Sequence, residues 1–195
     1  MAQAFTTPAV QDGYFCTQRP LLIQMPRVYC FEPIEDRAAT VLILGSMPGK
    51  VSLATGQYYA HARNAFWTIM GELIGAEPVL PYTDRIDILR GSGIALWDVL
   101  ASCVRTGSLD SDIQAGSVVP NDFNSFFRAH PDISRIYFNG AKAEQCFLKY
   151  VHPYLESAAL QYRRLPSTSP ANAGISYGQK LFAWQSVIAQ PDEKQ

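Results

Sequence analysis

The 195-residue chain has no apolar run approaching the roughly 20 residues that a membrane-spanning helix needs, so we predict no membrane span. Its first 16 residues lack the basic start and apolar core of a secretory signal, which predicts a cytoplasmic, intracellular location. Zinc and iron–sulfur sites need cysteines at characteristic spacings, and no C-x-x-C pair is present. We therefore predict no bound metal and four free thiols, at Cys16, Cys30, Cys103 and Cys146.

The chain also lacks the basic bias that DNA-binding proteins usually show, because its formal net charge is −1. The charge is unevenly distributed: residues 131–180 hold six basic and three acidic residues, a local balance of +3. An enzyme that scans DNA and then releases it does not need a large phosphate-binding surface. The low net charge is therefore compatible with transient binding of nucleic acid.

Composition and periodicity predict one globular α/β domain over residues 36–195, preceded by an irregular, proline-rich arm over residues 1–35. Apolar runs predict buried strands over residues 39–46 and 93–100, a third strand is predicted over residues 135–140, and alternation predicts a fourth over residues 160–167. Helical spacing predicts helices over residues 64–75, 121–130, 141–151 and 176–189. In the first of these, Asn64 is placed to cap the helix and Gly75 to end it. Strands that alternate with helices predict a parallel sheet covered on both faces.

Ligands of such sheets bind beyond the carboxyl ends of the strands. That rule selects four segments, which we expect to converge on one cleft: residues 45–49, 97–98, 139–140 and 165–172.

The segment G-S-M-P-G, residues 45–49, predicts a rigid loop in which two glycines allow tight backbone turns. Its N–H groups can face an anion or a carbonyl oxygen, although an ordinary strand-to-loop turn explains the pattern equally well. The loop is neither a Gly-Lys-Ser/Thr phosphate loop nor a dinucleotide fingerprint. That absence argues against an enzyme of free nucleotides.

Two further segments carry groups suited to nucleic acid. In Q-Y-Y-A-H-A-R-N-A-F-W, residues 57–67, Tyr58 and Tyr59 can stack on an extruded base, and His61 is a candidate general base. In L-P-S-T-S-P-A-N, residues 165–172, three hydroxyls can grip phosphate. The alternative readings are a surface histidine, core aromatic residues and a polar turn.

Taken in this order and spacing, the segments resemble the uracil-DNA glycosylase superfamily, and within it the hypoxanthine-DNA glycosylase branch. The likeness runs from residue 39 to residue 189 and includes G-I-A-L-W-D-V-L and Y-F-N-G-A-K-A. It implies a three-layer α/β/α sandwich around a four-stranded parallel sheet. It also implies a monomer without metal, nucleotide or other cofactor that hydrolyses the N-glycosidic bond of a flipped deoxynucleotide in DNA.

The resemblance also implies which residues form the site. Other branches carry Asp or Asn in the first motif, where this chain has Ser46 and Met47, and the catalytic Asn of this branch falls on Asn64. Leu165 replaces the His of the uracil-type second motif, so no role of that His can be transferred. Base contacts are expected from Gly45, Tyr59, Phe66, Trp97 and Asn139. DNA contacts are expected from Ser167, Thr168, Ser169, Arg63 and Lys142.

Cleavage leaves positive charge on the sugar and negative charge on the base, so the site must provide donors and an oriented water. Because an amide is neither acid nor base near neutral pH, Asn64 is predicted to position water or to donate to the purine. The backbone N–H groups near Ser46 and Met47 are candidates to bind O6. The motifs contain no lysine except Lys50, which predicts a monofunctional enzyme that leaves an abasic site. Hypoxanthine is the expected base; a uracil-preferring enzyme and a non-catalytic lesion-binding module are the alternatives.

Overall fold

A four-stranded, all-parallel sheet forms the centre of the computed structural model, which describes residues 27–107, 110–156 and 160–189. Its strand order is β3-β2-β6-β7. The strands are β2 (Val41–Gly45), β3 (Ile94–Asp98), β6 (Arg135–Asn139) and β7 (Gln161–Leu165). Each lies within a predicted range, so the predicted parallel sheet is confirmed. β2 and β3 are buried at every residue, as their continuous apolar runs predict.

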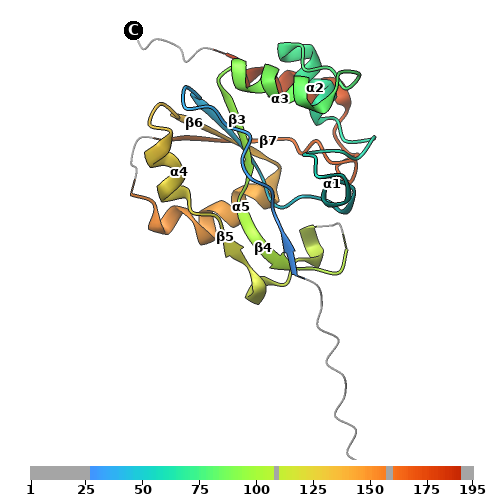
Figure 1. Ribbon diagram of the computed structural model, residues 1–195. Coiled ribbons are helices and arrows are strands. Elements are labelled where there is room, and N and C mark those ends of the chain that lie inside the picture. The colour runs from blue at the N-terminus through green and yellow to red at the C-terminus, as the bar shows by residue number, and fades with distance from the viewer. Residues whose placement is uncertain (1–26, 108–109, 157–159, 190–195) are drawn as a thin grey trace, which may run out of the picture.

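Helices cover both faces of this sheet (Figure 1). Because side chains alternate along a strand, Trp97 and Phe138 point to one face, where they pack against Phe123 and Phe147. On the other face, Phe66 packs edge-on against Trp184. The first face is covered by α4 (Phe123–Ala129) and α5 (Ala141–Tyr150), and the second by α2 (Phe66–Ile74), α3 (Tyr82–Gly91) and α6 (Tyr177–Trp184). The three-layer α/β/α sandwich is therefore confirmed.

A second, antiparallel sheet was not predicted. Its order is β1-β4-β5, formed by β1 (Arg27–Tyr29), β4 (Leu100–Val104) and β5 (Val119–Pro120). The predicted strand over residues 93–100 is therefore two strands, which meet at Val99. There the N–H of Val99 makes the last bond of the parallel ladder, to the carbonyl of Gly45, and the N–H of Leu100, the first residue of β4, binds the carbonyl of Ser46.

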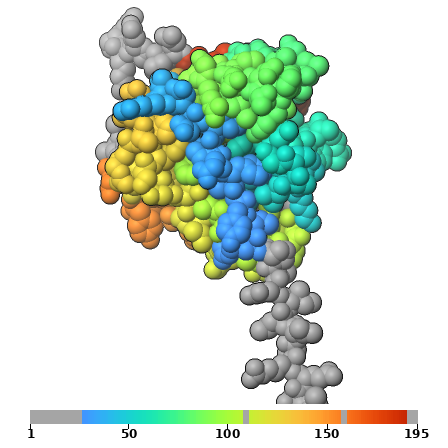
Figure 2. Space-filling model, in the orientation of Figure 1, coloured from blue at the N-terminus to red at the C-terminus, as the bar shows by residue number. Residues whose placement is uncertain are grey.

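The predicted irregular arm is wrong for residues 27–29, which form β1, while residues 1–26, with Cys16, lie outside the described residues. The described part crosses one face of the molecule as the blue band of Figure 2, between the yellow α4 and the green and teal helices. Ile34 forms an antiparallel bridge to Leu96 of β3. This bridge covers the outer edge of the parallel sheet, which would otherwise expose unpaired N–H and C=O groups.

Several boundaries differ from the prediction. The expected loop after G-S-M-P-G contains α1 (Lys50–Thr55), and α3 was missed because its residues are mostly polar. The N-cap of α2 is Ala65 rather than Asn64, while Gly75 ends the helix at φ 80°, as predicted. α4 begins two residues after the predicted start at residue 121, and its N-cap is Asp122, whose side chain accepts from the N–H of Ser125.

Short 3₁₀ helices complete the described chain: η1 (Asp110–Asp112), η2 (Ala115–Ser117), η3 (His152–Tyr154) and η4 (Gln185–Val187). No helix among the described residues has the length and apolarity needed to cross a bilayer.

Candidate active site

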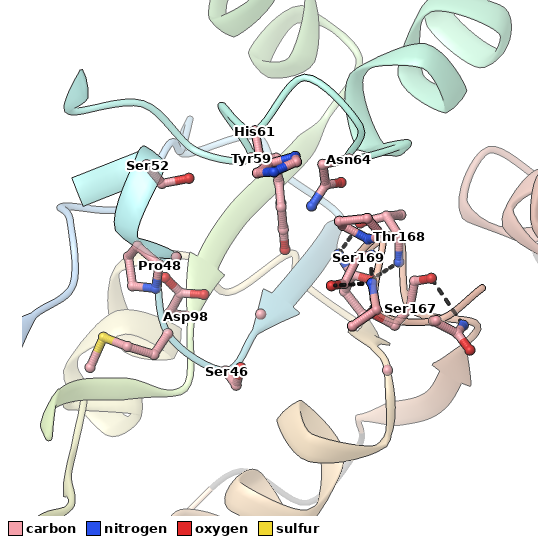
Figure 3. Close-up of a pocket in the computed structure, with 18 of the residues that line it drawn as sticks. Ser46, Pro48, Ser52, Tyr59, His61, Asn64, Asp98, Ser167, Thr168 and Ser169 are labelled. Atoms are coloured by element: carbon pink, nitrogen blue, oxygen red, sulfur yellow. Dashed lines mark hydrogen bonds between the residues drawn. The ribbon is translucent and has the colours of Figure 1, made fainter. Parts of the chain in front are cut away.

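A cavity of about 1150 Å³ opens at the carboxyl edge of the parallel sheet (Figure 3). All four segments selected from the sequence contribute to its wall: residues 45–49 after β2, Asp98 of β3, residues 139–140 after β6 and residues 165–172 after β7. The predicted convergence is confirmed, and it follows from the parallel order, which brings the strand ends to the same edge.

Close packing around Gly45 brings a carboxylate and a phenol together. Gly45 pairs with Asp98 across β2 and β3. A Cβ at Gly45 would lie 2.2 Å from Oδ1 of Asp98 and 2.9 Å from the hydroxyl oxygen of Tyr59. Neither Gly45 nor Gly49 has a positive φ. A side chain at Gly45 would collide with the carboxylate and the hydroxyl that approach it.

Asp98 lies in the selected segment of residues 97–98, but the sequence analysis assigned it no role in the site. Its side chain lines the cavity and the residue is only 3% exposed. Burial raises the pKa of Cys30 to about 11, and the charge of Asp98 adds to that increase. Burial, and next the charge of Asp98, also raise the pKa of Tyr58. The available signal was an acidic residue at the end of the apolar strand I-A-L-W-D, because such a carboxyl falls at the ligand-binding edge.

Asn64 lies on the opposite wall of the cavity, in the turn that leads into α2. Its side-chain Oδ1 accepts from the backbone N–H of Phe66 at 3.0 Å. The backbone N–H of Asn64 donates to the carbonyl of His61 at 2.7 Å. These bonds fix the amide so that its nitrogen lies on the cavity side (Figure 3). His61 also lines the cavity, and its Nδ1 accepts from the N–H of Arg63 at 3.1 Å.

Tyr59 supplies an aromatic wall. It lies in the left-handed region, with φ 53°, and its ring stacks on Phe66 with 4.2 Å between ring centroids. Phe66 itself is fully buried and does not line the cavity, so the predicted base contact by Phe66 is wrong. It supports Tyr59 from behind.

The predicted base contact by Trp97 is also wrong. Trp97 points to the face opposite Asp98, packs against Phe123 and Phe126, and donates its Nε1–H to the carbonyl of Phe31. Neighbouring residues of β3 therefore point to opposite faces of the sheet: Trp97 into the core and Asp98 into the cavity.

The hydroxyl-rich loop after β7 divides into lining and buried residues. Ser167 and Ser169 are half-buried and line the cavity, and their contact with DNA stays a prediction. Thr168 also touches the cavity but is only 1% exposed, so direct phosphate contact by Thr168 is wrong. Arg63 is exposed and Lys142 half-buried, and both lie outside the cavity wall.

A buried arginine binds the G-S-M-P-G loop. Arg105, directly after β4, is 3% exposed and donates from Nη2 to the carbonyl of Pro48. Together with the bonds from Val99 and Leu100 to the loop carbonyls, this contact fixes residues 45–48 against the second sheet. Arg105 could not be selected from the sequence, because its partner is a backbone atom 57 residues away.

Comparison with known proteins agrees with this architecture. Residues 33–188 match the model of the Uracil DNA glycosylase superfamily, and the chain belongs to that superfamily. The fold and the site thus define a member of a superfamily of enzymes that remove bases from DNA.

The similar proteins narrow the class. Two proteins named hypoxanthine DNA glycosylase are 34% identical to this chain. The one from Methanosarcina barkeri matches over 73% of this chain and 86% of its own length. The one from Methanosarcina acetivorans matches over 81% and 96%. A solution NMR structure of a uracil DNA glycosylase candidate from M. acetivorans has a TM-score of 0.69 and 32% identity, covering 84% of this chain and 97% of that one. This chain is a DNA N-glycosylase.

Proposed function

We propose that the cavity receives hypoxanthine turned out of DNA and that the enzyme hydrolyses the bond between this base and C1′ of the sugar. The main support is the position of Asn64, which faces the same cavity as the Tyr59 ring, the G-S-M-P-G loop and the Asp98 carboxylate. An enzyme that acts on a base must extrude it from the stacked duplex and hold it between aromatic and polar groups. The names of the similar proteins from Methanosarcina favour hypoxanthine as that base.

The base lies against Tyr59, which Phe66 holds in place. The N–H groups of Ser46 and Met47 donate to O6 of the purine. Their loop is suited to this because the N–H groups of Val99 and Leu100 already bind the Gly45 and Ser46 carbonyls, which sets the orientation of the peptide planes. Donors held rigidly before the reaction stabilise the negative charge that develops on the departing base. Asn139 borders the same space and provides a further amide contact.

Asn64 acts by hydrogen bonding and not by proton transfer, because an amide does not titrate near neutral pH. Its Oδ1 keeps one lone pair beyond the bond from Phe66, and its NH₂ group lies on the cavity side. The amide therefore donates to the leaving purine or holds the attacking water.

The Asp98 carboxylate supplies the complementary negative charge. Departure of the base leaves an oxocarbenium-like sugar, and a buried carboxylate stabilises this cation and orients the water that attacks C1′. Its near-complete burial strengthens the interaction, since the local dielectric constant is low.

The sites for DNA lie around the mouth of the cavity. Ser167 and Ser169 contact phosphate, and Arg63 and Lys142 add positive charge nearby. Among the described residues, Lys50 is the one lysine that lines the cavity, and its side chain belongs to an exposed residue of α1. A water, and not this amine, is therefore the proposed nucleophile, and the product is an abasic site.

The test uses end-labelled duplexes with a single deoxyinosine or deoxyuridine, incubated with enzyme and then treated with or without alkali. We expect strand breaks at deoxyinosine that require alkali and that are lost in Asn64→Ala. Cleavage at deoxyuridine alone would keep the enzyme class and refute the substrate. Breaks without alkali would refute the monofunctional mechanism. Full activity of Asn64→Ala would refute the role of Asn64.

A further inference from the structure

Thr168 differs from the serines beside it in the hydroxyl-rich loop. Ser167 and Ser169 are half-buried at the cavity mouth, whereas Thr168 is 1% exposed. A hydroxyl with so little accessible surface cannot reach a phosphate in solvent. A buried hydroxyl must have partners inside the protein, and those partners show what it does.

Thr168 forms a reciprocal pair with Asn139, the last residue of β6. The N–H of Thr168 donates to Oδ1 of Asn139 at 2.9 Å, and Nδ2 of Asn139 donates to Oγ1 of Thr168 at 2.9 Å. A paired amide of this kind fixes both the distance and the rotation between two segments. Gly140 strengthens the join, because a Cβ at Gly140 would lie 2.8 Å from Cβ of Ser167.

The third bond of Thr168 reaches the turn that carries Asn64. The carbonyl of Thr168 accepts from the N–H of Ala65 at 3.0 Å. Ala65 stands between Asn64 and Phe66, and the N–H of Phe66 holds the Asn64 side chain. Figure 3 shows Thr168 beside Asn64 at the cavity wall. The position of the Asn64 amide relative to the sheet thus depends on Thr168.

We infer that Thr168 is a positioning residue that couples the DNA-contacting loop to the Asn64 amide. Ser167 and Ser169 engage the DNA backbone, and Thr168 transmits the position of the loop to Asn64 through Ala65. The inference rests on the proposed role of Asn64. It separates two functions within one loop: the serines determine binding, and the threonine determines the rate of the chemical step.

The test compares variants in single-turnover cleavage of the deoxyinosine duplex, or of the deoxyuridine duplex if that is the one the wild type cleaves. Enzyme concentration is varied to give the maximal rate constant and the half-saturating concentration. Thr168→Val replaces the hydroxyl with a methyl of similar size. We expect a drop in maximal rate of about 10- to 100-fold, the effect of misplacing a catalytic group by up to 1 Å, with half-saturation unchanged. Ser169→Ala should instead raise the half-saturating concentration and leave the maximal rate constant unchanged.

Thr168→Ser keeps the hydroxyl and should retain most of the maximal rate. Thr68→Val makes the same chemical change on an exposed part of α2 and should change neither quantity. If Thr168→Val does not fold at the assay temperature, Thr168→Ala removes the hydroxyl without adding a buried methyl group. Circular dichroism gives the folded fraction of each variant.

Three results would overturn the coupling. Thr168→Val could raise the half-saturating concentration with an unchanged maximal rate, which would make it a DNA contact. Thr168→Ser could lose as much rate as Thr168→Val, so that the hydroxyl would not be the determinant. Asn64→Ala could be fully active, which would remove both the proposed role of Asn64 and the coupling. Failure to cleave deoxyinosine with normal cleavage of deoxyuridine affects only the proposed substrate.

Discussion

The packing around Gly45 gives a sharp test of the site, because the same loop holds a matched control. Gly45→Ala places a methyl group 2.2 Å from Oδ1 of Asp98 and 2.9 Å from the Tyr59 hydroxyl. In Gly49→Ala the new methyl group meets nothing within 4 Å. Gly49 also has an ordinary extended conformation, with φ −69° and ψ 168°, which alanine adopts freely.

The size of the effect follows from the distances. Non-bonded carbon and oxygen atoms normally lie at least about 3.3 Å apart, so the Asp98 carboxylate or the strand must move by about 1 Å. Overfilling a packed site of this kind costs roughly 1–3 kcal/mol of unfolding free energy. For a chain of this length, each 1 kcal/mol lowers Tm by roughly 2–4 °C. A displacement of about 1 Å within the catalytic constellation also lowers the rate by up to about 100-fold.

Two assays report these effects separately. Thermal unfolding followed by circular dichroism measures the loss of stability, and single-turnover cleavage of the deoxyinosine duplex measures the loss of rate. Gly45→Ala should show both losses and Gly49→Ala neither. The double variant Gly45→Ala, Asp98→Ala should recover part of the lost stability but not the rate, because it removes the clash together with the carboxylate.

The reasoning is refuted if Gly45→Ala and Gly49→Ala have the same Tm and the same rate. Such a result would mean that the carboxylate of Asp98 does not lie over Gly45. A loss of stability in Gly45→Ala with a normal rate would keep the packing but remove Asp98 and Tyr59 from the chemistry.

Three further predictions concern charge. Asp98→Asn keeps the shape of the side chain and removes its charge. Single-turnover cleavage should therefore slow by about 100-fold, while affinity for an abasic-site analogue is retained. An equal loss of affinity would contradict a role of Asp98 in the chemical step. Arg63→Gln should weaken binding equally for all DNA sequences and reduce the slope of log affinity against log salt concentration by about 1. An unchanged slope in a salt titration would exclude a phosphate contact by Arg63. The pKa of Cys30 is raised by burial from 9.0 to about 11, so the folded state keeps a proton that the unfolded state loses. The unfolding free energy should therefore fall as pH rises from about 9 to about 11, more steeply in the wild type than in Cys30→Ala, as urea unfolding at each pH would show.

The amino-acid pattern was sufficient to predict the central sheet and the place of the cavity. β2 and β3 are continuous apolar runs and β7 follows an alternating pattern, which are local properties of the sequence, and the parallel order then brings the segments that follow the strands to one edge. The order of motifs was also sufficient to predict the superfamily that the comparisons show. Asn64, Tyr59 and the loop of residues 45–49 were selected in this way, and all of them line the cavity.

The second sheet and the antiparallel β1 could not be predicted in this way. β4 continues the apolar pattern of β3 without a turn signal, and the chain changes sheet after Val99, where β4 pairs with β1 and β5 instead of with β2. Such partners are distant in the sequence and leave no local pattern.

The roles of individual side chains also depended on tertiary structure. Trp97 and Asp98 are neighbours in the sequence, but the strand sends one into the aromatic core and the other into the cavity. The three hydroxyls of residues 167–169 look equivalent in the sequence, yet only Thr168 is buried against Asn139. Local apolar pattern determines which segments become strands. Which atom of a segment faces ligand, core or a partner loop depends on register and long-range contacts, which form only when the chain is folded.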